Sequence, residues 1–333
     1  MKFQIITPEF GLEKGGIQSW AYYINKVYVD NNYDVNVFSY KEPKASSLMN
    51  LLRSFLSPQN YVLMTWKMSI FILPLFLFST FAKFNIYIVF HGNDFLNLSK
   101  FQKKILLRII KIKNVTTIAN SCSIAEMFKN TFNEEIDKII YPFMELPEVN
   151  KVANVNYHNE GNFKLCTITR LVKRKNIENV ILAINELKKE KIFVSYVIGG
   201  KGPELSKLST LILDLNLNDQ IQIIGSVTEK NKWEIIKNSD AFILPSIFDE
   251  KDGSIEGYGI VYIEANAMGI PNISGNTGGA IEAVINNQTG IHTSGTVSSI
   301  KNAIIKCMNT SFSKKDILQH ALKHDIQNRT NFP

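Results

Sequence analysis

Short apolar runs alternate with helical patterns along most of the chain, and they do so in two separate stretches. In the first stretch the runs expected as strands are 3–7, 34–39, 61–65, 85–90, 115–119 and 138–141. In the second they are 164–169, 193–199, 220–225, 240–245 and 271–274. Strands that alternate with helices form parallel sheets covered on both faces. The sequence therefore predicts an α/β protein with two Rossmann-like, doubly wound domains.

The alternation breaks once, in an Asn-rich segment that contains Pro147 and has little apolar periodicity. We place the linker at 149–162, the first domain at 1–148 and the second at 163–333. A chain of 333 residues fits two domains of about 150 residues each. Such sheets bind ligands at the carboxyl ends of their strands, so we expect the site in a cleft across which the domains face each other.

Two of the expected helices have specific starting residues. Asn176 is expected to cap the helix 176–189, which carries apolar residues at helical spacing. Pro203 is expected as the first residue of the helix 203–215, because proline suits that position. A further helix is expected around Trp233.

Composition excludes several classes of protein. A hydrophobic content of 45% with 20% charged residues is typical of a soluble globular chain. The three cysteines are scattered, and with no signal peptide they predict reduced thiols in the cytoplasm. The five histidines do not cluster with cysteines, so no metal site is expected.

The segment 68–81 is the most apolar run of the chain. It has about 14 residues and contains Pro74, whereas a membrane span needs about 20 residues. We expect a buried crossover helix here, and an apolar surface that touches lipid is the alternative.

The segment 100–113 combines many Lys and Arg residues with a stripe of Ile105, Ile109 and Ile112. A basic amphipathic helix of this kind can rest on anionic lipid, and a surface helix with a solvated basic face has the same pattern. No aromatic-basic ladder or finger motif accompanies the charge, so nucleic acid is not expected as a partner.

The segment 254–269 carries the clearest chemical signal. A turn with Glu256, Gly257 and Gly259 opens a helix, and Glu264 follows eight residues after the first carboxylate. The glycines let backbone amides approach a ligand, and a helix N-terminus favours a phosphate. The carboxylates lie on the order of 10 Å apart, too far to share a proton. Two hydroxyl-bearing rings on either side of a phosphate linker, as in a nucleotide sugar, fit this spacing; an acidic first turn with a solvated Glu is the alternative.

A basic loop follows the first strand of the second domain. Arg170 ends that strand, and Lys173, Arg174 and Lys175 follow at once. Cations at the mouth of a cleft suit a diphosphate. A solvated basic loop has the same sequence.

Two glycine loops also fall at strand ends. Gly15 and Gly16 open the first helix, where their amides can hold an anion, although a plain turn has the same sequence. The turn 199–203 resembles a dinucleotide fingerprint, but Leu205 stands where that motif has its third glycine. The sequence therefore argues against a nicotinamide-dependent dehydrogenase.

His91 and Asp94 follow the strand run 85–90. A lone histidine is more often structural than catalytic. One at the carboxyl end of a strand beside an aspartate is a candidate for the site.

Together these segments resemble the family-4 retaining glycosyltransferases of the GT-B fold, from the Gly15–Gly16 loop to about Thr289. The resemblance is most specific at Arg170 with Lys175, at the turn 200–203 and at 245–264. The segment 277–284 is similar to the Gly-Gly-x-x-Glu element of that family.

The resemblance implies roles for individual residues. Arg170 and Lys175 would neutralise the leaving diphosphate, Glu256 would bind hydroxyls of the transferred sugar, and Glu264 would bind the ribose. The implied catalytic residues are His91, Glu256, Arg170 and Lys175. The implied donor-binding residues are Gly15, Gly16, Gly200, Gly202, Gly257, Tyr258, Gly259, Ile260 and Glu264.

The resemblance also implies a chemistry. The anomeric configuration would be retained, with the departing phosphate helping to deprotonate the acceptor, so that no protein nucleophile, no metal and no other cofactor is needed. On this basis we expect the change Glu256→Ala to abolish transfer and to leave folding intact.

The donor implied is a hexose nucleotide, with a small preference for GDP-mannose over a UDP-sugar. The basic and apolar character of the first domain indicates a lipid-linked glycan or glycolipid as acceptor, and surface polysaccharide biosynthesis fits such an acceptor. We therefore expect a cytoplasmic enzyme, peripheral on the inner face of the membrane. Members of the family commonly end in an aromatic-containing helix that crosses back to the first domain, whereas this sequence stops about where that helix would begin. A sugar-nucleotide epimerase, a dehydrogenase and a non-catalytic sugar-binding module are the other hypotheses.

Overall fold

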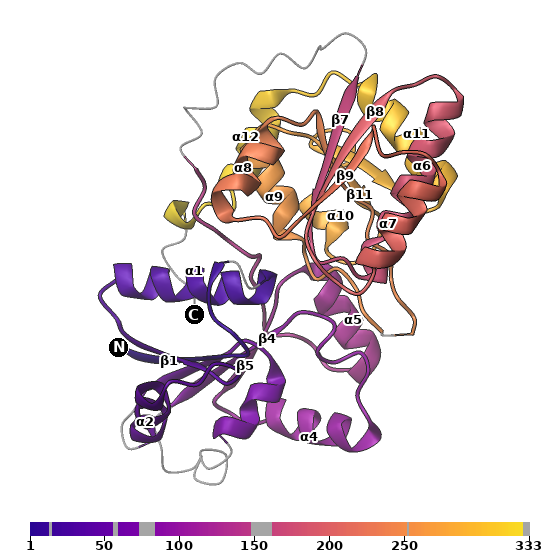
Figure 1. The fold of residues 1–333 in the computed structure, drawn as a ribbon. Coiled ribbons are helices and arrows are strands. Elements are labelled where there is room, and N and C mark those ends of the chain that lie inside the picture. The colour runs from indigo at the N-terminus through magenta and orange to yellow at the C-terminus, as the bar shows by residue number, and fades with distance from the viewer. Residues whose placement is uncertain (13–14, 56–58, 73–83, 148–161, 252, 329–333) are drawn as a thin grey trace. The chain divides into compact units, whose positions relative to one another are not determined.

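The computed structural model describes residues 1–12, 15–55, 59–72, 84–147, 162–251 and 253–328. By its internal contacts the chain divides into two compact units, Met1–Glu145 with Asp325–Pro333, and Leu146–His324. Figure 1 shows each unit as a sheet with helices on both of its faces.

The first unit is built on a six-stranded sheet in the order β2-β1-β3-β4-β5-β6, with parallel pairing throughout. The helix α1 covers one face, and α2 and α4 cover the other (Figure 1). The strands are β1 (Lys2–Thr7), β2 (Asp34–Ser39), β3 (Asn60–Leu63), β4 (Asn85–Phe90), β5 (Val115–Ala119) and β6 (Lys138–Ile139). The helices are α1 (Gly16–Asp30), α2 (Ala45–Ser54), α4 (Lys100–Ile110) and α5 (Cys122–Phe132), with the 3-10 helices η2 (Trp66–Ile72) and η5 (Ile326–Asn328).

The second unit has a six-stranded parallel sheet in the order β12-β11-β10-β7-β8-β9. The helices α6, α7 and α11 cover one face, and α8, α9 and α12 cover the other (Figure 1). The strands are β7 (Phe163–Ile168), β8 (Val194–Gly199), β9 (Ile221–Gly225), β10 (Ala241–Leu244), β11 (Asn272–Gly275) and β12 (Gly290–Thr293). The helices are η4 (Lys173–Lys175), α6 (Ile177–Lys189), α7 (Leu205–Asp214), α8 (Glu229–Lys237), α9 (Ile260–Ala267), α10 (Ala280–Ala283), α11 (Val297–Met308) and α12 (Lys314–Leu322).

The predicted fold class is confirmed, because both units are parallel α/β sheets. The second sheet, counted from β9, has the chain order 3-2-1-4-5-6 of dinucleotide-binding domains. In that order the chain changes direction between the neighbouring strands β7 and β10. Such a switch point opens a crevice at the carboxyl ends of the two strands, so the loops after β7 and β10 are where a ligand is expected.

Several local predictions are wrong. Asn176 has a left-handed backbone (φ 58°) and its side chain does not cap the helix. The side-chain Nδ2 instead donates to the carbonyls of Pro245 (3.2 Å) and Gly295 (2.8 Å). The helix expected from Pro203 begins at Leu205, after the N-cap Glu204.

The apolar stripe predicted for α4 is shifted along the helix. Leu106 and Ile109 are the buried residues, and Ile105 and Ile112 are only half-buried. The start is fixed by a capping box, in which Ser99 and Gln102 bond each other's backbone amides. The buried helix expected over 68–81 is a 3-10 helix as far as Ile72, and 73–83 lie outside the described residues.

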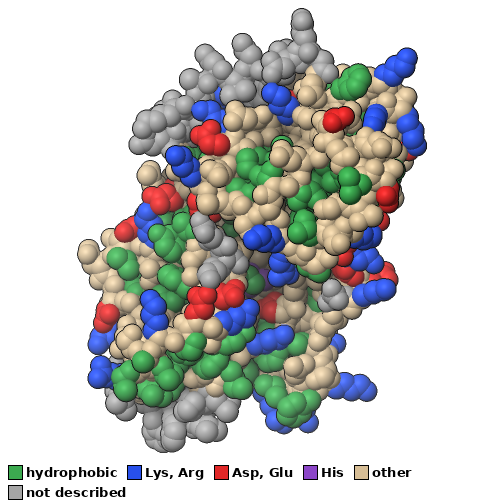
Figure 2. All heavy atoms as spheres, viewed as in Figure 1, with side chains coloured by type: hydrophobic (Ala, Val, Ile, Leu, Met, Phe, Trp, Pro, Cys, Tyr) green, Lys and Arg blue, Asp and Glu red, His purple; other side chains and the backbone are tan. Residues whose placement is uncertain are grey.

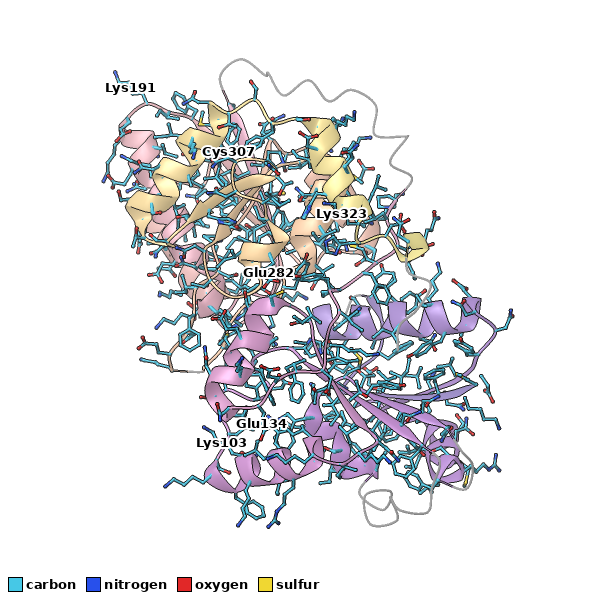
Figure 3. All side chains as sticks on the ribbon, turned by 180° about the vertical axis from the view of Figure 1, so that it is seen from behind. Lys103, Glu134, Lys191, Glu282, Cys307 and Lys323 are labelled. Atoms are coloured by element: carbon cyan, nitrogen blue, oxygen red, sulfur yellow. The ribbon has the colours of Figure 1, made fainter. Side chains whose placement is uncertain are left out.

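The C-terminal segment groups with the first unit rather than with the second. A parallel bridge joins Met144 to Asp325, and the amide of Ile326 donates to the Met144 carbonyl at 2.8 Å. The three cysteines all lie among the described residues and form no disulfide; two of them are buried, including Cys307 in α11 (Figure 3). Among the described residues, no helix combines the length and the apolar character that crossing a bilayer requires.

Candidate functional site

Glu256 lies at the switch point of the second sheet, in the segment that follows β10. Its Oε2 atom accepts hydrogen bonds from Arg174 at 2.9 Å, from Ser246 at 3.0 Å, and from Lys175. Arg174 and Lys175 belong to the loop after β7, so the two loops meet at this one carboxylate. All three donors act on Oε2 rather than on Oε1.

Charge and burial set the protonation of this cluster. Burial alone would raise the pKa of Glu256, but Lys175 and Arg174 outweigh it and lower the pKa to about 2. Burial lowers the pKa of Lys175 to about 8; Glu256 opposes this shift, and the nearby charges of Arg174 and Arg170 add to it. Arg170 itself is exposed. Two cations, Arg174 and Lys175, therefore contact one ionised carboxylate, and the charge of Arg170 acts on Lys175 in the same loop. The loop thus carries more positive charge than Glu256 neutralises.

Glycines allow the loops of this site to touch backbone to backbone. A Cβ at Gly200 would lie 1.8 Å from the Thr169 carbonyl oxygen, and one at Gly202 would lie 2.1 Å from that of Leu171. The amide of Leu171 also donates to the Lys201 carbonyl at 2.9 Å. The turn 200–203 therefore supports the two residues that flank Arg170.

A second pair of glycines holds the turn that carries Glu256. The amide of Gly279 donates to the Glu256 carbonyl at 2.9 Å. A Cβ at Gly278 would lie 2.4 Å from that carbonyl, and one at Gly279 would lie 2.0 Å from the carbonyl of Gly257. The element 277–284 is thus the backbone support of the Glu256 turn.

The helix α9 begins directly after this turn. Gly259 precedes it with φ 90°, and Ile260 is its first residue. Tyr258 is buried, and its hydroxyl lies 3.0 Å from Nε2 of His324. The amides at the start of α9 are therefore carried by a turn whose side chain is anchored in the interior of the unit.

Glu264 points from α9 toward a cation that the sequence did not indicate. Lys232 of α8 lies 2.6 Å from Glu264 Oε1 and 2.7 Å from Glu229. The two carboxylates raise the pKa of Lys232 against the effect of burial. Burial raises the pKa of Glu264, and the charge of Lys232 opposes that shift.

His91 follows β4 in the first unit and is buried. Its Nε2 lies 2.9 Å from the Met64 carbonyl, and its Nδ1 lies 3.3 Å from the side-chain Nδ2 of Asn120. Since a carbonyl only accepts, Nε2 carries the proton and Nδ1 accepts from Asn120. Burial lowers the pKa of His91 to about 4, so the ring is neutral at physiological pH. The His91 amide donates to Asp94 at 3.0 Å.

Gly15 and Gly16 lie at the start of α1, and both are exposed. Gly15 has φ 129°, and nothing lies within 4 Å of a Cβ placed on Gly16. Trp20 of the same helix lies edge-on to the His91 ring, with 5.7 Å between the ring centroids. The first unit thus brings its glycine turn and its histidine to one region.

The sequence missed Arg174 as a partner of Glu256, Ser246 as a donor and Lys232 altogether. Arg174 stood in the basic loop, but nothing in its spacing distinguished it from Arg170. Lys232 belongs to no motif, and the sequence alone does not show that a lysine on a helix is buried between two carboxylates. Among the described residues, no three His, Cys, Asp or Glu side chains are grouped as a metal site requires.

Residues 149–326 match the family model described as "Glycosyl transferases group 1". Over 142 residues the chain is 32% identical to the GDP-mannose-dependent alpha-(1-6)-phosphatidylinositol monomannoside mannosyltransferase of Mycobacterium tuberculosis H37Rv, a match that covers 42% of this chain and 37% of that protein. Over 127 residues it is 31% identical to the putative colanic acid biosynthesis glycosyltransferase WcaL of Escherichia coli K12, covering 38% and 31%. The matches thus span less than two fifths of the length of these relatives.

Among solved structures, HepE of Anabaena in complex with UDP and glucose superimposes with a TM-score of 0.73 at 17% identity. The superposition covers 98% of this chain and 96% of that one. At this identity the likeness shows a common fold across both units.

Proposed function

This chain belongs to the glycosyl transferases group 1 family and has the GT-B fold, and on that premise we propose that it is a family-4 retaining hexosyltransferase. It moves a hexose from a nucleotide sugar to a lipid-linked glycan or glycolipid in surface polysaccharide biosynthesis. The observation that carries the proposal is the buried Glu256, held by Lys175 and Arg174 at the switch point of the second sheet.

In the proposed reaction the diphosphate lies against the basic loop. Arg170, Arg174 and Lys175 neutralise the charge that develops as the sugar–phosphate bond breaks. Glu256 accepts hydrogen bonds from hydroxyls of the transferred hexose at Oε1, because its Oε2 already accepts three hydrogen bonds. Backbone amides at the start of α9 stabilise the negative charge of the diphosphate. They belong to Gly257, Tyr258, Gly259 and Ile260.

The remaining proposed contacts are those of the ribose, the diphosphate and the hexose edge. Glu264 binds the ribose hydroxyls, Gly16 donates a backbone amide to the diphosphate, and His91 lies beside the hexose. Because the His91 ring is neutral, its contribution is a hydrogen bond or packing and not charge. As the bond from the anomeric carbon to the phosphate breaks, the departing phosphate takes the acceptor proton on that same face. The acceptor oxygen then bonds to the anomeric carbon on the face that the phosphate leaves, so the configuration is retained without a protein nucleophile or a divalent metal.

The donor is proposed as a GDP- or UDP-hexose. The mycobacterial relative is named as GDP-mannose-dependent, and the structural neighbour holds UDP and glucose. These two likenesses support different bases, so the nucleotide is the first property to measure.

Thermal unfolding against a panel of nucleotides tests the proposal. GDP, UDP, ADP, their hexose conjugates and NAD are compared with EDTA present. A ligand at about 100 times its Kd should add roughly 2.7 kcal/mol to the free energy of unfolding, and Arg170→Ala should remove the gain. Stabilisation by NAD alone would refute the transferase. Conversion of the nucleotide sugar without any acceptor would favour an epimerase.

Nucleotide binding is expected to weaken at alkaline pH because Lys175 loses its proton near pH 8. A bound diphosphate holds the proton on Lys175, so the Kd should rise about tenfold between pH 7 and pH 9. Isothermal titration calorimetry at pH 7, 8 and 9 measures this. The variant Lys175→Arg, which stays charged, should give a flat profile; equal slopes in both proteins would contradict the assignment.

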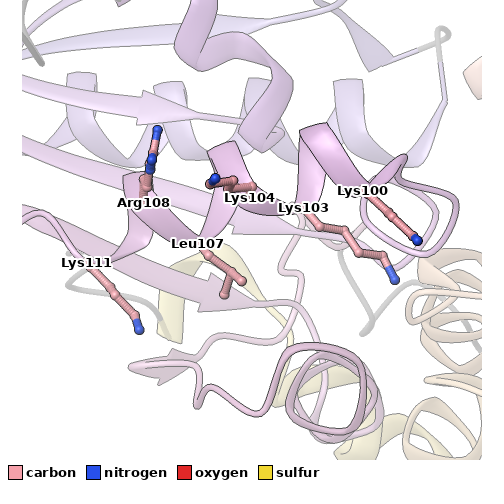
Figure 4. Close-up of a pocket in the computed structure, with 6 residues that line it drawn as sticks. All are labelled: Lys100, Lys103, Lys104, Leu107, Arg108 and Lys111. Atoms are coloured by element: carbon pink, nitrogen blue, oxygen red, sulfur yellow. The ribbon is translucent and has the colours of Figure 1, made fainter.

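We also propose that the first unit contacts an anionic membrane surface. Lys100, Lys104, Arg108 and further cations project from α4 around Leu107 (Figure 4). Hydrophobic side chains gather over α2 (Figure 2), where Leu48, Met49 and Leu52 are each about half exposed. Cations attracted to anionic headgroups beside apolar side chains that can enter the interface suit peripheral binding.

Removing three charges from α4 is expected to weaken membrane binding by about 100-fold, since each Lys or Arg near an anionic surface contributes about 1 kcal/mol. The variant Lys100→Gln/Lys104→Gln/Arg108→Gln is compared with wild type by sedimentation with vesicles of phosphatidylglycerol and phosphatidylcholine. Lys188→Gln/Lys189→Gln, in the second unit, is the control. Binding that survives in the α4 variant would argue against this surface.

A further inference from the structure

The carboxylate of Glu264 is satisfied at one oxygen and unsatisfied at the other. Lys232 Nζ lies 2.6 Å from Oε1, whereas Oε2 is buried and has no hydrogen-bond partner among the described residues. A buried carboxylate oxygen without a donor is costly. A ligand hydroxyl that donates to Oε2 would remove that cost.

Lys232 is itself buried, which is unusual for a lysine. Its ammonium group lies between Glu264 and Glu229 and 4.8 Å from the centroid of the Trp233 ring. These contacts hold the group at one place instead of letting the side chain sample the solvent. Because its position is fixed, the orientation of the Glu264 carboxylate is fixed as well.

We propose that Lys232 is a positioning residue for the donor: it orients Glu264 through Oε1 so that Oε2 accepts the ribose hydroxyls of the nucleotide. This rests on the proposed function, in which Glu264 binds the ribose. Less than 1 Å² of Oε2 is exposed in this structure, so the groups that cover this oxygen shift when the ribose binds. Burial raises the pKa of Glu264, and the charge of Lys232 opposes that shift.

A purely structural role for Lys232 makes a different prediction. If Lys232 only neutralises a buried carboxylate, its removal would loosen α8 and α9. The binding of every nucleotide would then weaken to the same extent. A lysine that positions Glu264 matters only to ligands with ribose hydroxyls. Nucleotides without these hydroxyls therefore separate the two roles.

The experiment is calorimetry with UDP, GDP and their 2′,3′-dideoxy counterparts. Wild type should bind the ribonucleotide more tightly than the dideoxynucleotide. Lys232→Met should raise the Kd of the ribonucleotide about tenfold or more and leave the Kd of the dideoxynucleotide unchanged. Lys232→Arg should restore part of the preference. Lys230→Met, which removes an exposed lysine two residues away on α8, is the control and should match wild type.

Thermal unfolding of each variant checks folding, and any general destabilisation cancels because the two ligands are compared on the same variant. Equal losses for both ligands, or an undiminished ribose preference in Lys232→Met, would overturn the inference and leave the proposed function standing. If neither UDP nor GDP binds wild type, the proposed function and this inference both fail.

Discussion

Replacing Glu256 with glutamine is expected to lower the rate of hexose transfer by about 100-fold or more. The change keeps the size of the side chain and removes the negative charge that accepts hydrogen bonds from the sugar hydroxyls and pairs with Arg174 and Lys175. Losing one preorganised interaction of this kind costs about 2.7–4 kcal/mol in the transition state. The measurement is steady-state transfer from the nucleotide sugar that stabilises the protein.

The ion pairs of Glu256 also change what we expect of stability. From the sequence, Glu256→Ala was expected to leave folding intact, but Arg174 and Lys175 both depend on this carboxylate. Breaking a buried pair by removing one partner costs about 3–5 kcal/mol. We therefore expect either Glu256 variant to unfold with its midpoint at a lower urea concentration than wild type.

A double variant tests the effect on stability. Glu256→Gln/Lys175→Met removes one cation together with the carboxylate, so part of the lost stability should return. The effect on transfer is measured with Glu256→Gln alone, without urea and with circular dichroism showing that the variant is folded. Transfer at the wild-type rate by the folded variant would mean that Glu256 does not contact the sugar.

Strand positions were predictable because each strand is a short apolar run bounded by turn residues. The ranges 34–39, 85–90 and 115–119 are those of β2, β4 and β5. Parallel strands buried on both faces read as continuous apolar runs. The alternation with helices then leaves few topologies.

The contacts within the candidate site were less predictable, because they join residues far apart in the chain. Arg174 and Glu256 are 82 residues apart, and Lys232 and Glu264 are 32 apart. A motif indicates which loop carries charge, but the direction of each side chain depends on the backbone. Arg174 contacts Glu256 because the loop after β7 makes a 3-10 turn at Lys173–Lys175.

Asn176 shows the same limit for a local rule. The residue types at 176–189 favour an N-cap, yet the 3-10 turn before it places Asn176 in the left-handed region. Its side-chain Nδ2 then donates to two carbonyls on other segments, those of Pro245 and Gly295. Tertiary hydrogen bonds replaced a helix cap that the sequence alone favours.

Gly200→Ala is expected to lower the free energy of unfolding by about 3 kcal/mol. The backbone at Gly200 has φ 142°, and the new Cβ would lie 1.8 Å from the Thr169 carbonyl oxygen. Strain at such a dihedral and overpacking against backbone each cost about 1–3 kcal/mol. Neither can be relieved by a side-chain rotation, because the contact is with the main chain beside Arg170.

The matched control is Gly16→Ala, where nothing lies within 4 Å of the added Cβ and no loss of stability is expected. Urea unfolding followed by circular dichroism compares both variants with wild type. Since the turn at Gly200 supports the residues around Arg170, nucleotide binding by Gly200→Ala should weaken even where the variant is fully folded. Equal unfolding midpoints for the two variants would show that the loop after β7 yields easily, and would remove the argument that this turn sets the position of Arg170.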